Sequence, residues 1–549
     1  MKPVEALIQV LREEGVTRVF GNPGTTELPF LDALVHQPDI EYVLGVHEGS
    51  VVAMADGYAR ATGRPAFVSL HVAAGLANGL SGLLNASRSR TPMVVTAGQQ
   101  DRRHLAQDPM LSADLVGLAR AAVKATFDVQ HAQDLPGMLR RAFRLAVLPP
   151  AGPVFLSVPM DLLAEETDVT FFDAPIVPPS VATGVARATA LLAGARDPAV
   201  VAGDGVGREG GVASLVAIAE VLGAVVYHQP MHDGVDFPMG HDLYAGALPP
   251  NNAEIRGTLA PHDVVLIVGC HAFMPHHYSP GPAIMPDTLV VQIDSDPAEI
   301  GRNFTVELGL VGAIEPTLQQ LATALRALPP VSRAQHRRAE LRERHVEQRA
   351  AVDTAALKAY GPVPLDPLAA AHAVASGLPA DAVVVEEAIT TGVLLRQVLR
   401  LEQPRSLVHT VGGGLGFGIG AAIGTAMGDP ARPVVAVLGD GCSMFGLQGL
   451  WGAARYDVPV TFVVMNNGEY RTLKDTLDVW DSRATRAGHY PGLDLGSLDF
   501  TTAAAFFGIE AHRVEHIDEL VQLVAGAAHR RRPLLIDVPI LGHRQGAQQ

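Results

Sequence analysis

Two polar side chains that could share a metal ion each follow an apolar segment of the chain. Asp440 stands in a Gly-Asp-Gly tripeptide, and Asn467 stands in Asn-Asn-Gly. One carboxylate, one amide oxygen and nearby backbone carbonyls make an incomplete oxygen cage, which suits Mg²⁺ because this ion completes its octahedron with phosphate oxygens. The neighbouring glycines let a phosphate approach the backbone, and the N-terminus of a following helix favours an anion. The pair therefore predicts a site for Mg²⁺ and a phosphate group.

The segments before Asp440 and Asn467 are expected to bring the two side chains together. Val434–Leu438 and Val460–Met465 are apolar and rich in β-branched residues, as is typical of buried parallel strands. The interval between the motifs is long enough for one right-handed helical crossover, so both side chains would reach the same sheet edge. In the alternative interpretation the motifs are ordinary turns between strand and helix, where Gly and Asn are common.

The length and composition limit the classes of protein to consider. A chain of 549 residues is too long for a single core and suggests roughly three domains. Hydrophobic residues make up 48% and charged residues 18%, which is typical of a well-buried globular protein. The net charge of −16 argues against a general nucleic-acid-binding surface. Cys270 and Cys442 lie far apart and outside any CxxC pattern, so neither a disulfide framework nor a zinc site is expected.

One uncharged stretch, 411–428, approaches the length of a membrane span. Eight of its residues are glycine and Pro430 follows it, so a glycine-packed loop and helix beside a ligand explains it better. The N-terminal segment MKPVEALIQVLREEG has the pattern of an amphipathic helix and not of a signal peptide. We therefore expect a soluble, cytoplasmic protein without membrane attachment.

Strand and helix patterns alternate in the N-terminal third, which indicates a doubly wound parallel sheet. Polar residues follow the expected strands: His47 and Glu48 follow Tyr42–Val46, and His71 follows Ala66–Leu70. Sheets of this kind place their ligands at the C-terminal ends of the strands. Further strands are expected at Arg18–Phe20, Met93–Ala97, Ala199–Ala202, Val264–Val268, Leu289–Ile293 and Ala382–Glu386.

Several motifs resemble those of the benzoylformate decarboxylase family, whose members are thiamine diphosphate (ThDP)-dependent 2-keto acid decarboxylases. The similar stretches are GNPGTTELPF, EGSVVAMADGYAR, LHVAAG, TAGQQ and the spaced GDG and NNG motifs, and the resemblance runs through nearly the whole chain. It implies an α/β fold of three doubly wound parallel-sheet domains. These are a pyrimidine-binding domain (1–180), a middle domain (181–330) and, after a charged helical linker (331–361), a diphosphate-binding domain (362–549).

The resemblance implies ThDP and Mg²⁺ as cofactors, with Ca²⁺ able to replace the magnesium. Glu48 matches the carboxylic acid that hydrogen-bonds the pyrimidine ring, and Asp440, Asn467 and the carbonyl of Glu469 match the metal ligands. FAD, which some members carry in the middle domain, is not expected because GDGVGREGG lacks the dinucleotide spacing. Other matching positions are Gly413, whose carbonyl would accept the cofactor's amino group, Leu415, which would wedge between its rings, and Gly439, Gly441, Cys442, Ser443 and Tyr470.

Two histidines, His71 and His276, match proton carriers of the family, because imidazole titrates near neutral pH. Thr25 matches a serine that hydrogen-bonds the substrate carboxylate; threonine keeps the hydroxyl, but its methyl group narrows the site. The expected substrate pocket is more polar than a phenyl-binding pocket. Its residues are Pro23, the apolar wall of Met110 and Leu111, and the polar positions His409, Thr472 and Thr476.

The resemblance implies a carboxy-lyase that converts a benzoylformate-like 2-keto acid to an aldehyde, with carboligation as a side activity. In this family the pyrimidine-binding domain of one subunit faces the diphosphate-binding domain of another, so a homodimer at least, commonly a homotetramer, is expected. Two alternatives stay open: an acetolactate synthase-like transferase that ligates a second carbonyl compound, and a non-catalytic ThDP-binding protein. His71 and His276 favour protonation over ligation, and the intact Glu48 argues against a protein without activity.

Overall fold

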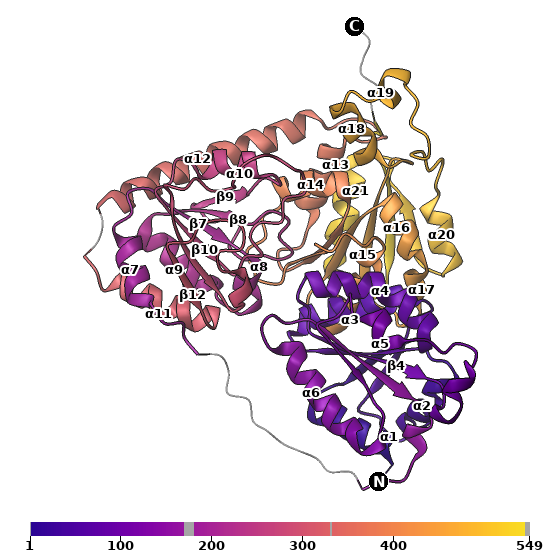
Figure 1. Ribbon diagram of the computed structural model, residues 1–549. Helices are drawn as coiled ribbons and strands as arrows, with labels where there is room; N and C mark the ends of the chain where they lie inside the picture. The colour runs from indigo at the N-terminus through magenta and orange to yellow at the C-terminus, as the bar shows by residue number, and fades with distance from the viewer. Residues whose placement is uncertain (1, 169–179, 330–331, 544–549) are drawn as a thin grey trace. The chain divides into compact units, whose positions relative to one another are not determined.

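The chain forms two compact units in the computed structural model, which describes residues 2–168, 180–329 and 332–543 (Figure 1). The first unit comprises the described parts of Met1–Ala174, Ala359–Leu395 and Thr410–Gln549. The second comprises the described parts of Pro175–Lys358 and Arg396–His409. Three six-stranded parallel sheets flanked by helices confirm the predicted α/β fold. The start of the predicted linker, residue 331, lies outside the described residues.

The first sheet has the strand order β2-β1-β3-β4-β6-β5 and lies in the first unit. All residues of β3, β4 and β6 are buried, which fits the continuous apolar runs of strands covered by helices on both faces. The second strand ends at Leu44, before the predicted Val46. The strands are β1 Arg18–Gly21, β2 Glu41–Leu44, β3 Ala66–Leu70, β4 Met93–Gln99, β5 Ala125–Asp128 and β6 Pro153–Pro159.

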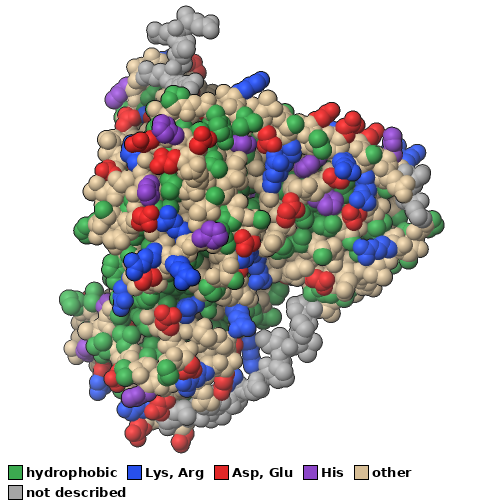
Figure 2. All heavy atoms as spheres, turned by 180° about the vertical axis from the view of Figure 1, so that it is seen from behind, with side chains coloured by type: hydrophobic (Ala, Val, Ile, Leu, Met, Phe, Trp, Pro, Cys, Tyr) green, Lys and Arg blue, Asp and Glu red, His purple; other side chains and the backbone are tan. Residues whose placement is uncertain are grey.

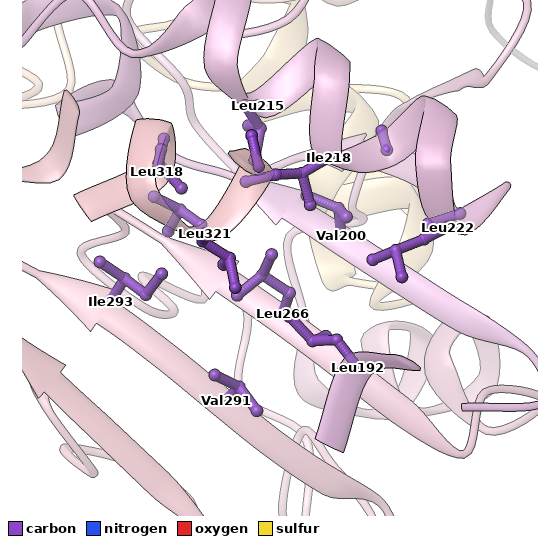
Figure 3. Packing of buried hydrophobic residues seen from close by; sticks show 14 of the residues in the cluster. Leu192, Val200, Leu215, Ile218, Leu222, Leu266, Val291, Ile293, Leu318 and Leu321 are labelled. Carbon is purple, nitrogen blue, oxygen red and sulfur yellow. The ribbon is translucent and has the colours of Figure 1, made fainter. Parts of the chain in front are cut away.

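The second unit contains the sheet β12-β11-β10-β7-β8-β9. Leucine and isoleucine side chains of its helices pack against Val200 and Leu266 on one face of the sheet (Figure 3). The neighbouring strand residues Val201 and Ile267 belong to a separate apolar cluster, as the alternation of side chains along a strand requires. The strands are β7 Pro198–Ala202, β8 Val225–His228, β9 Tyr244–Ala247, β10 Val264–Val268, β11 Leu289–Asp294 and β12 Leu308–Val311.

The third sheet has the order β14-β13-β15-β16-β18-β17. Its central strands β15 and β16 are the two apolar runs predicted before Asp440 and Asn467, and each is only one residue longer than predicted. They are adjacent and parallel, with Val434 opposite Val460. The strands are β13 Val383–Glu387, β14 Leu407–His409, β15 Val434–Gly439, β16 Val460–Asn466, β17 Glu510–Arg513 and β18 Leu534–Pro539.

Within the first unit, α3 (Glu48–Thr62) packs tightly against α15 (Phe417–Gly428). Side-chain carbons would collide at two glycines of this contact: one at Gly57 would lie 2.0 Å from the Ala421 carbonyl oxygen, and one at Gly424 would lie 1.8 Å from the Met54 carbonyl oxygen. The glycines of the uncharged stretch therefore serve close helix packing, as the sequence suggests. None of the helices formed by the described residues is long and apolar enough to cross a membrane.

The Arg- and Glu-rich segment of the second unit forms α12 (Ser332–Lys358), the longest helix of the described chain. On the face shown in Figure 2, basic and acidic side chains are interspersed. The other α-helices are α1 Pro3–Glu13, α2 Leu28–Leu34, α4 Val72–Arg88, α5 Leu115–Ala119, α6 Leu135–Val147, α7 Val185–Ala193, α8 Asp204–Arg208, α9 Val212–Leu222, α10 Asn252–Leu259, α11 Ile314–Arg326, α13 Pro367–Gly377, α14 Ile389–Val398, α16 Asp440–Gly446, α17 Leu450–Arg455, α18 Arg471–Val479, α19 Arg483–Ala487, α20 Phe500–Phe506 and α21 Ile517–Ala525.

Candidate active site

Asp440 and Asn467 meet at the C-terminal edge of β15 and β16, as the strand pattern predicts. One carboxylate oxygen of Asp440 accepts hydrogen bonds from the backbone N–H groups of Asn467 (3.0 Å) and Gly468 (2.6 Å). The other oxygen accepts from the backbone N–H of Gly441 at 2.7 Å. These bonds fix the loop after β16 to the first residues of α16.

The loop after β16 is held in a defined shape by glycine geometry and by a second segment. Gly468 has a φ of +69°, and a side-chain carbon there would lie 2.6 Å from the Gly496 carbonyl oxygen. The side-chain oxygen of Asn467 accepts a hydrogen bond from the backbone N–H of Glu469 at 3.0 Å. The N–H of Tyr470 donates to the Leu493 carbonyl at 2.9 Å. The loop that presents Asn467 and the Glu469 carbonyl is therefore well ordered by local contacts.

The donor set at Asp440 fits a magnesium ion. Asp440 is only 4% exposed, and burial raises the pKa of its carboxyl group, as expected for a buried anion. No group of three or more His, Cys, Asp and Glu side chains suited to a metal exists among the described residues. A metal at Asp440 would be held by carboxylate, amide, carbonyl and phosphate oxygens, which is the set that Mg²⁺ accepts and zinc does not favour.

A buried lysine supports the same loop and was not predicted. The ammonium group of Lys474, on α18, donates to the carboxylates of Glu469 (2.5 Å) and Asp494. Lys474 is 8% exposed and Glu469 11%, so solvent screens their ion pair weakly. The backbone N–H of His543 also donates to the Glu469 carboxylate. Lys474 follows Glu469 by five residues, and this spacing alone does not distinguish it from a surface lysine.

Glu48 begins α3 and is held by two asparagines. One of its carboxylate oxygens accepts a hydrogen bond from the side chain of Asn22 at 3.1 Å, and the other accepts from Asn78 at 3.0 Å. Glu48 is 6% exposed, and a side-chain carbon at Gly75 would lie 3.1 Å from its carboxylate. A buried carboxylic group in fixed orientation can hold and exchange a proton with a ring nitrogen placed against it.

His71 is the N-cap residue of α4, and its ring bonds to a second buried acid, Glu27. The Nδ1 atom of His71 lies 2.9 Å from a Glu27 carboxylate oxygen. Glu27 is 4% exposed, and its carboxylate also accepts from the backbone N–H groups of Gly24 (2.8 Å) and Gly98 (3.0 Å) and from the Thr26 hydroxyl (2.6 Å). In the tautomer whose Nδ1–H donates to Glu27, Nε2 is the ring nitrogen left for proton transfer.

The glycine loop before α15 is tied to α4. The side chain of Asn85 donates to the Gly414 carbonyl at 2.8 Å and accepts from the Gly414 N–H at 2.9 Å. Gly413 has a φ of +76°, and no atom outside its chain neighbours lies within 4 Å of the place where a side-chain carbon would stand. The loop thus presents the predicted acceptor Gly413 and the half-buried Leu415 on a backbone held at its middle.

Sequence reasoning missed Asn22, Glu27, Asn78 and Asn85, although signals for them exist. Asn22 and Glu27 lie inside the motif GNPGTTELPF. Asn78 and Asn85 are seven residues apart, so they share one face of a helix whose other residues, apart from the terminal Arg88, are small or apolar. A repeated amide on such a face indicates a polar partner, and the partners are Glu48 and the glycine loop.

The remaining predicted residues of the first unit lie in varied environments. The Ser443 hydroxyl donates to the Gly439 carbonyl at 2.8 Å, and burial raises the pKa of the Cys442 thiol. The Thr476 hydroxyl donates to the Thr472 carbonyl at 2.7 Å within α18. The other predicted residues differ in exposure: Thr25 is exposed, Pro23 and Tyr470 are half-buried, Met110 is 81% exposed and Leu111 is 40% exposed.

His276 and His409 lie in the second unit. His276 is exposed on the segment after β10, where its backbone N–H donates to the Pro250 carbonyl at 2.8 Å. The adjacent His277 has its ring centroid 4.5 Å from that of His276. His409 ends β14 and is 5% exposed. Their participation in the site stays a prediction.

Three family models match successive parts of the chain. The N-terminal TPP binding domain of thiamine pyrophosphate enzymes matches residues 1–123, the central domain matches 185–321, and the C-terminal TPP binding domain matches 390–538. Glu48 and His71 fall in the first match, and Asp440 and Asn467 fall in the third.

Individual proteins are similar over nearly the full length. A benzoylformate decarboxylase of Pseudomonas aeruginosa is 36% identical over 98% of this chain and 99% of its own. A probable acetolactate synthase large subunit of Methanocaldococcus jannaschii is 27% identical over 98% and 92%. The solved structure of the ThDP-dependent 4-hydroxybenzoylformate decarboxylase of Rhodococcus jostii RHA1 has a TM-score of 0.87 and 31% identity, with coverage of 99% and 100%. On this evidence the chain belongs to the thiamine pyrophosphate enzyme family, within the group that contains benzoylformate decarboxylase.

Proposed function

We propose that this protein is a ThDP- and Mg²⁺-dependent carboxy-lyase that converts a benzoylformate-like 2-keto acid to an aldehyde and CO₂. The observation that carries the proposal is the similarity to a benzoylformate decarboxylase, 36% identity over 98% of this chain, against 27% for an acetolactate synthase relative. The buried Glu48 and the paired Asp440 and Asn467 support it, because they supply the two ends of a cofactor site.

ThDP, when bound, supplies a nucleophilic carbon and an electron sink for the loss of CO₂. Glu48 would bind the pyrimidine ring and exchange a proton with it, held in orientation by Asn22 and Asn78. Asp440, Asn467 and the Glu469 carbonyl would hold Mg²⁺ or a substituting Ca²⁺ against the diphosphate. The remaining cofactor contacts are assigned to Gly413, Leu415, Gly439, Gly441, Cys442, Ser443 and Tyr470.

Substrate handling is assigned to Thr25, His71 and His276. The Thr25 hydroxyl would bind the substrate carboxylate before it leaves as CO₂. His71, with Nδ1 bonded to Glu27, would deliver a proton from Nε2 to the carbon from which CO₂ departs, so that an aldehyde is released. His276 would assist this proton transfer. Pro23, Met110, Leu111, His409, Thr472 and Thr476 would form the pocket.

The assembly and cellular setting are part of the same proposal. The pyrimidine-binding domain of one subunit would face the diphosphate-binding domain of another in a homodimer or homotetramer, in the cytoplasm. Domains 1–180, 181–330 and 362–549, joined by the linker 331–361, would divide these roles, without FAD in the middle domain. Carboligation of the released aldehyde would be a side activity.

Product identification separates this function from its main rival. The purified protein, loaded with ThDP and Mg²⁺, is incubated with a panel of aromatic and aliphatic 2-keto acids, and CO₂ and the organic product are measured. We expect an aldehyde as the main product from an aromatic 2-keto acid. A hydroxyketone or acetohydroxy acid as the main product would favour the acetolactate synthase-like function, for which the 27% identical relative is the specific support. No turnover of any member would favour a binding protein.

A further inference from the structure

A further buried glutamate, Glu387, lies beside the glycine loop without a part in the proposed chemistry. It ends β13 and is 2% exposed. One of its carboxylate oxygens accepts hydrogen bonds from the backbone N–H groups of Gly416 (2.7 Å) and Phe417 (3.2 Å), and the other accepts from Gly418 (2.7 Å). All three donors belong to the start of α15. The carboxylate therefore satisfies three of the N–H groups that a helix N-terminus leaves without partners.

Only a glutamate meets this arrangement. Glutamine has the same length, but its amide offers one acceptor atom and one donor, so an NH₂ group would face a backbone N–H. Aspartate keeps the charge but is shorter by one methylene group. Burial raises the pKa of Glu387 to about 7, and the three N–H groups oppose this shift by favouring the ionised form.

The bonds of Glu387 hold one end of the loop that is assigned to the cofactor. Gly416, its first donor, has a φ of +89°, and a side-chain carbon there would lie 2.8 Å from the backbone of Phe445 on α16. The loop is thus fixed at Gly414 by Asn85 and at Gly416 by Glu387. Leu415 lies between these two anchors, and Gly413 lies just before the first of them.

We infer that Glu387 is a positioning residue for cofactor binding: it preorganises the loop 412–416 so that Gly413 and Leu415 receive the cofactor without a further change of backbone shape. This inference rests on the proposed function, because the roles of Gly413 and Leu415 belong to it. A positioning role differs from a contribution to stability alone. If Glu387 only stabilised the fold, its loss would affect cofactor binding no more than the loss of a helix cap elsewhere in the same unit.

Cofactor affinity and turnover are measured separately to test the inference. The apoenzyme of Glu387→Gln is titrated with ThDP in the presence of Mg²⁺ by calorimetry, and kcat is measured at saturating ThDP. We expect the ThDP Kd to rise at least about tenfold, since a buried backbone donor loses its acceptor, while kcat changes by less than about threefold, because preorganisation lost before binding raises Kd more than it lowers the rate of a loaded site. Glu387→Asp should give an intermediate Kd.

Asp366 supplies the matched control. Its carboxylate caps α13 by accepting from the Leu368 N–H at 2.9 Å, so Asp366→Ala removes a helix cap in the same unit whose bond does not involve residues 412–416. We expect a lower Tm but a ThDP Kd within about twofold of the wild type. An unchanged Kd in Glu387→Gln, or an equal rise in Asp366→Ala, would overturn the inference.

Hydrogen exchange of the wild-type apoenzyme tests the same inference without a variant. We expect the amides of residues 416–418 to be protected before ThDP is added, as a preorganised loop requires. Fast exchange that slows only on addition of ThDP would overturn the inference. Failure of the wild-type protein to bind ThDP would instead overturn the proposed function, and the protection in the apoenzyme would still report on the loop.

Discussion

The Nδ1 atom of His71 lies 2.9 Å from the carboxylate of Glu27, which is itself 4% exposed and bonded to two backbone N–H groups. The acid therefore cannot turn away from the ring without leaving those donors unpaired. A fixed carboxylate at Nδ1 orients the imidazole ring and determines which ring nitrogen faces away from Glu27. Glu27 thus acts on the proposed proton transfer indirectly, by positioning the His71 ring.

Replacing Glu27 should lower the rate of turnover more than it weakens cofactor binding. Glu27→Gln replaces the carboxylate that faces Nδ1 with an amide, so the His71 ring is held less firmly in its orientation, and we expect kcat to fall by about ten- to a hundredfold. The ThDP Kd should stay within about threefold, because Glu27 lies outside the cofactor contacts. Steady-state kinetics and calorimetry check both. Glu41→Gln, which breaks the half-exposed ion pair with Arg18, is the control and should leave kcat unchanged.

Asp440 should decide metal-dependent cofactor binding. Asp440→Ala removes the only carboxylate assigned to Mg²⁺, so the charge of the diphosphate is poorly neutralised. We expect ThDP affinity to fall by about one to three orders of magnitude, measured by calorimetric titration with ThDP and Mg²⁺. Glu510→Ala, a half-exposed acid on β17 of the same sheet, should have no effect. Unchanged affinity in Asp440→Ala would mean that the metal lies elsewhere.

Glu48 should separate cofactor activation from cofactor binding. Glu48→Gln keeps a side chain of the same size between Asn22 and Asn78 but cannot exchange a proton with the pyrimidine ring. ThDP binding should survive within about tenfold, while turnover should fall at least about a hundredfold. The rate of hydrogen–deuterium exchange at C2 of bound ThDP is the direct measurement. Exchange at the wild-type rate in the variant would contradict the role given to Glu48.

The sequence predicted the strands that carry the chemistry better than the contacts that hold it. β3 and β10 have the predicted bounds, because continuous apolar runs define buried parallel strands without knowledge of their neighbours. The meeting of Asp440 and Asn467 follows from strand order in the same way. The sequence contains signals for Glu27 and Asn78 but does not identify their partners, and it contains no such signal for Lys474, because each residue acquires its role from a partner that only the fold brings within hydrogen-bond distance.

A buried acid of the second unit should impose a pH dependence on stability. Asp236 is 1% exposed, and burial, followed by the nearby charge of Asp233, raises its pKa to about 6. Since the folded state holds a proton that the unfolded state releases near pH 4, the stabilisation is complete below about pH 4 and is lost as the pH rises through about 6. Asp236→Asn mimics the protonated acid, so its Tm should exceed that of the wild type increasingly between pH 5 and 8.

Asp263 gives the control of opposite sign for this prediction. Its carboxylate accepts from the backbone N–H groups of Arg196 (2.9 Å) and Asp197 (2.8 Å), and these bonds outweigh desolvation and lower its pKa. The stabilisation it provides is present above about pH 4 and is lost as the pH falls below that value. Asp263→Asn should therefore lower the Tm at neutral pH. Thermal unfolding followed by circular dichroism at several pH values compares the two variants, and parallel pH profiles for Asp236→Asn and the wild type would contradict the assignment.

Lys474 should control how well the metal loop is formed. Its ammonium group joins Glu469, whose carbonyl is assigned to Mg²⁺, to Asp494 on the segment that pairs with the loop. Lys474→Met keeps the aliphatic stem but leaves the nearly buried Glu469 carboxylate without its cation, which is strongly unfavourable. We expect the Mg²⁺ concentration for half-maximal activity to rise about tenfold, equivalent to about 1.4 kcal/mol. The measurement is a magnesium titration at saturating ThDP.

Arg486→Met, which removes an exposed ion pair with Asp481 from the same unit, should leave the titration unchanged. A shift of equal size in both variants would assign the effect to lost surface charge, whereas a shift confined to Lys474→Met would tie it to the loop that carries Glu469.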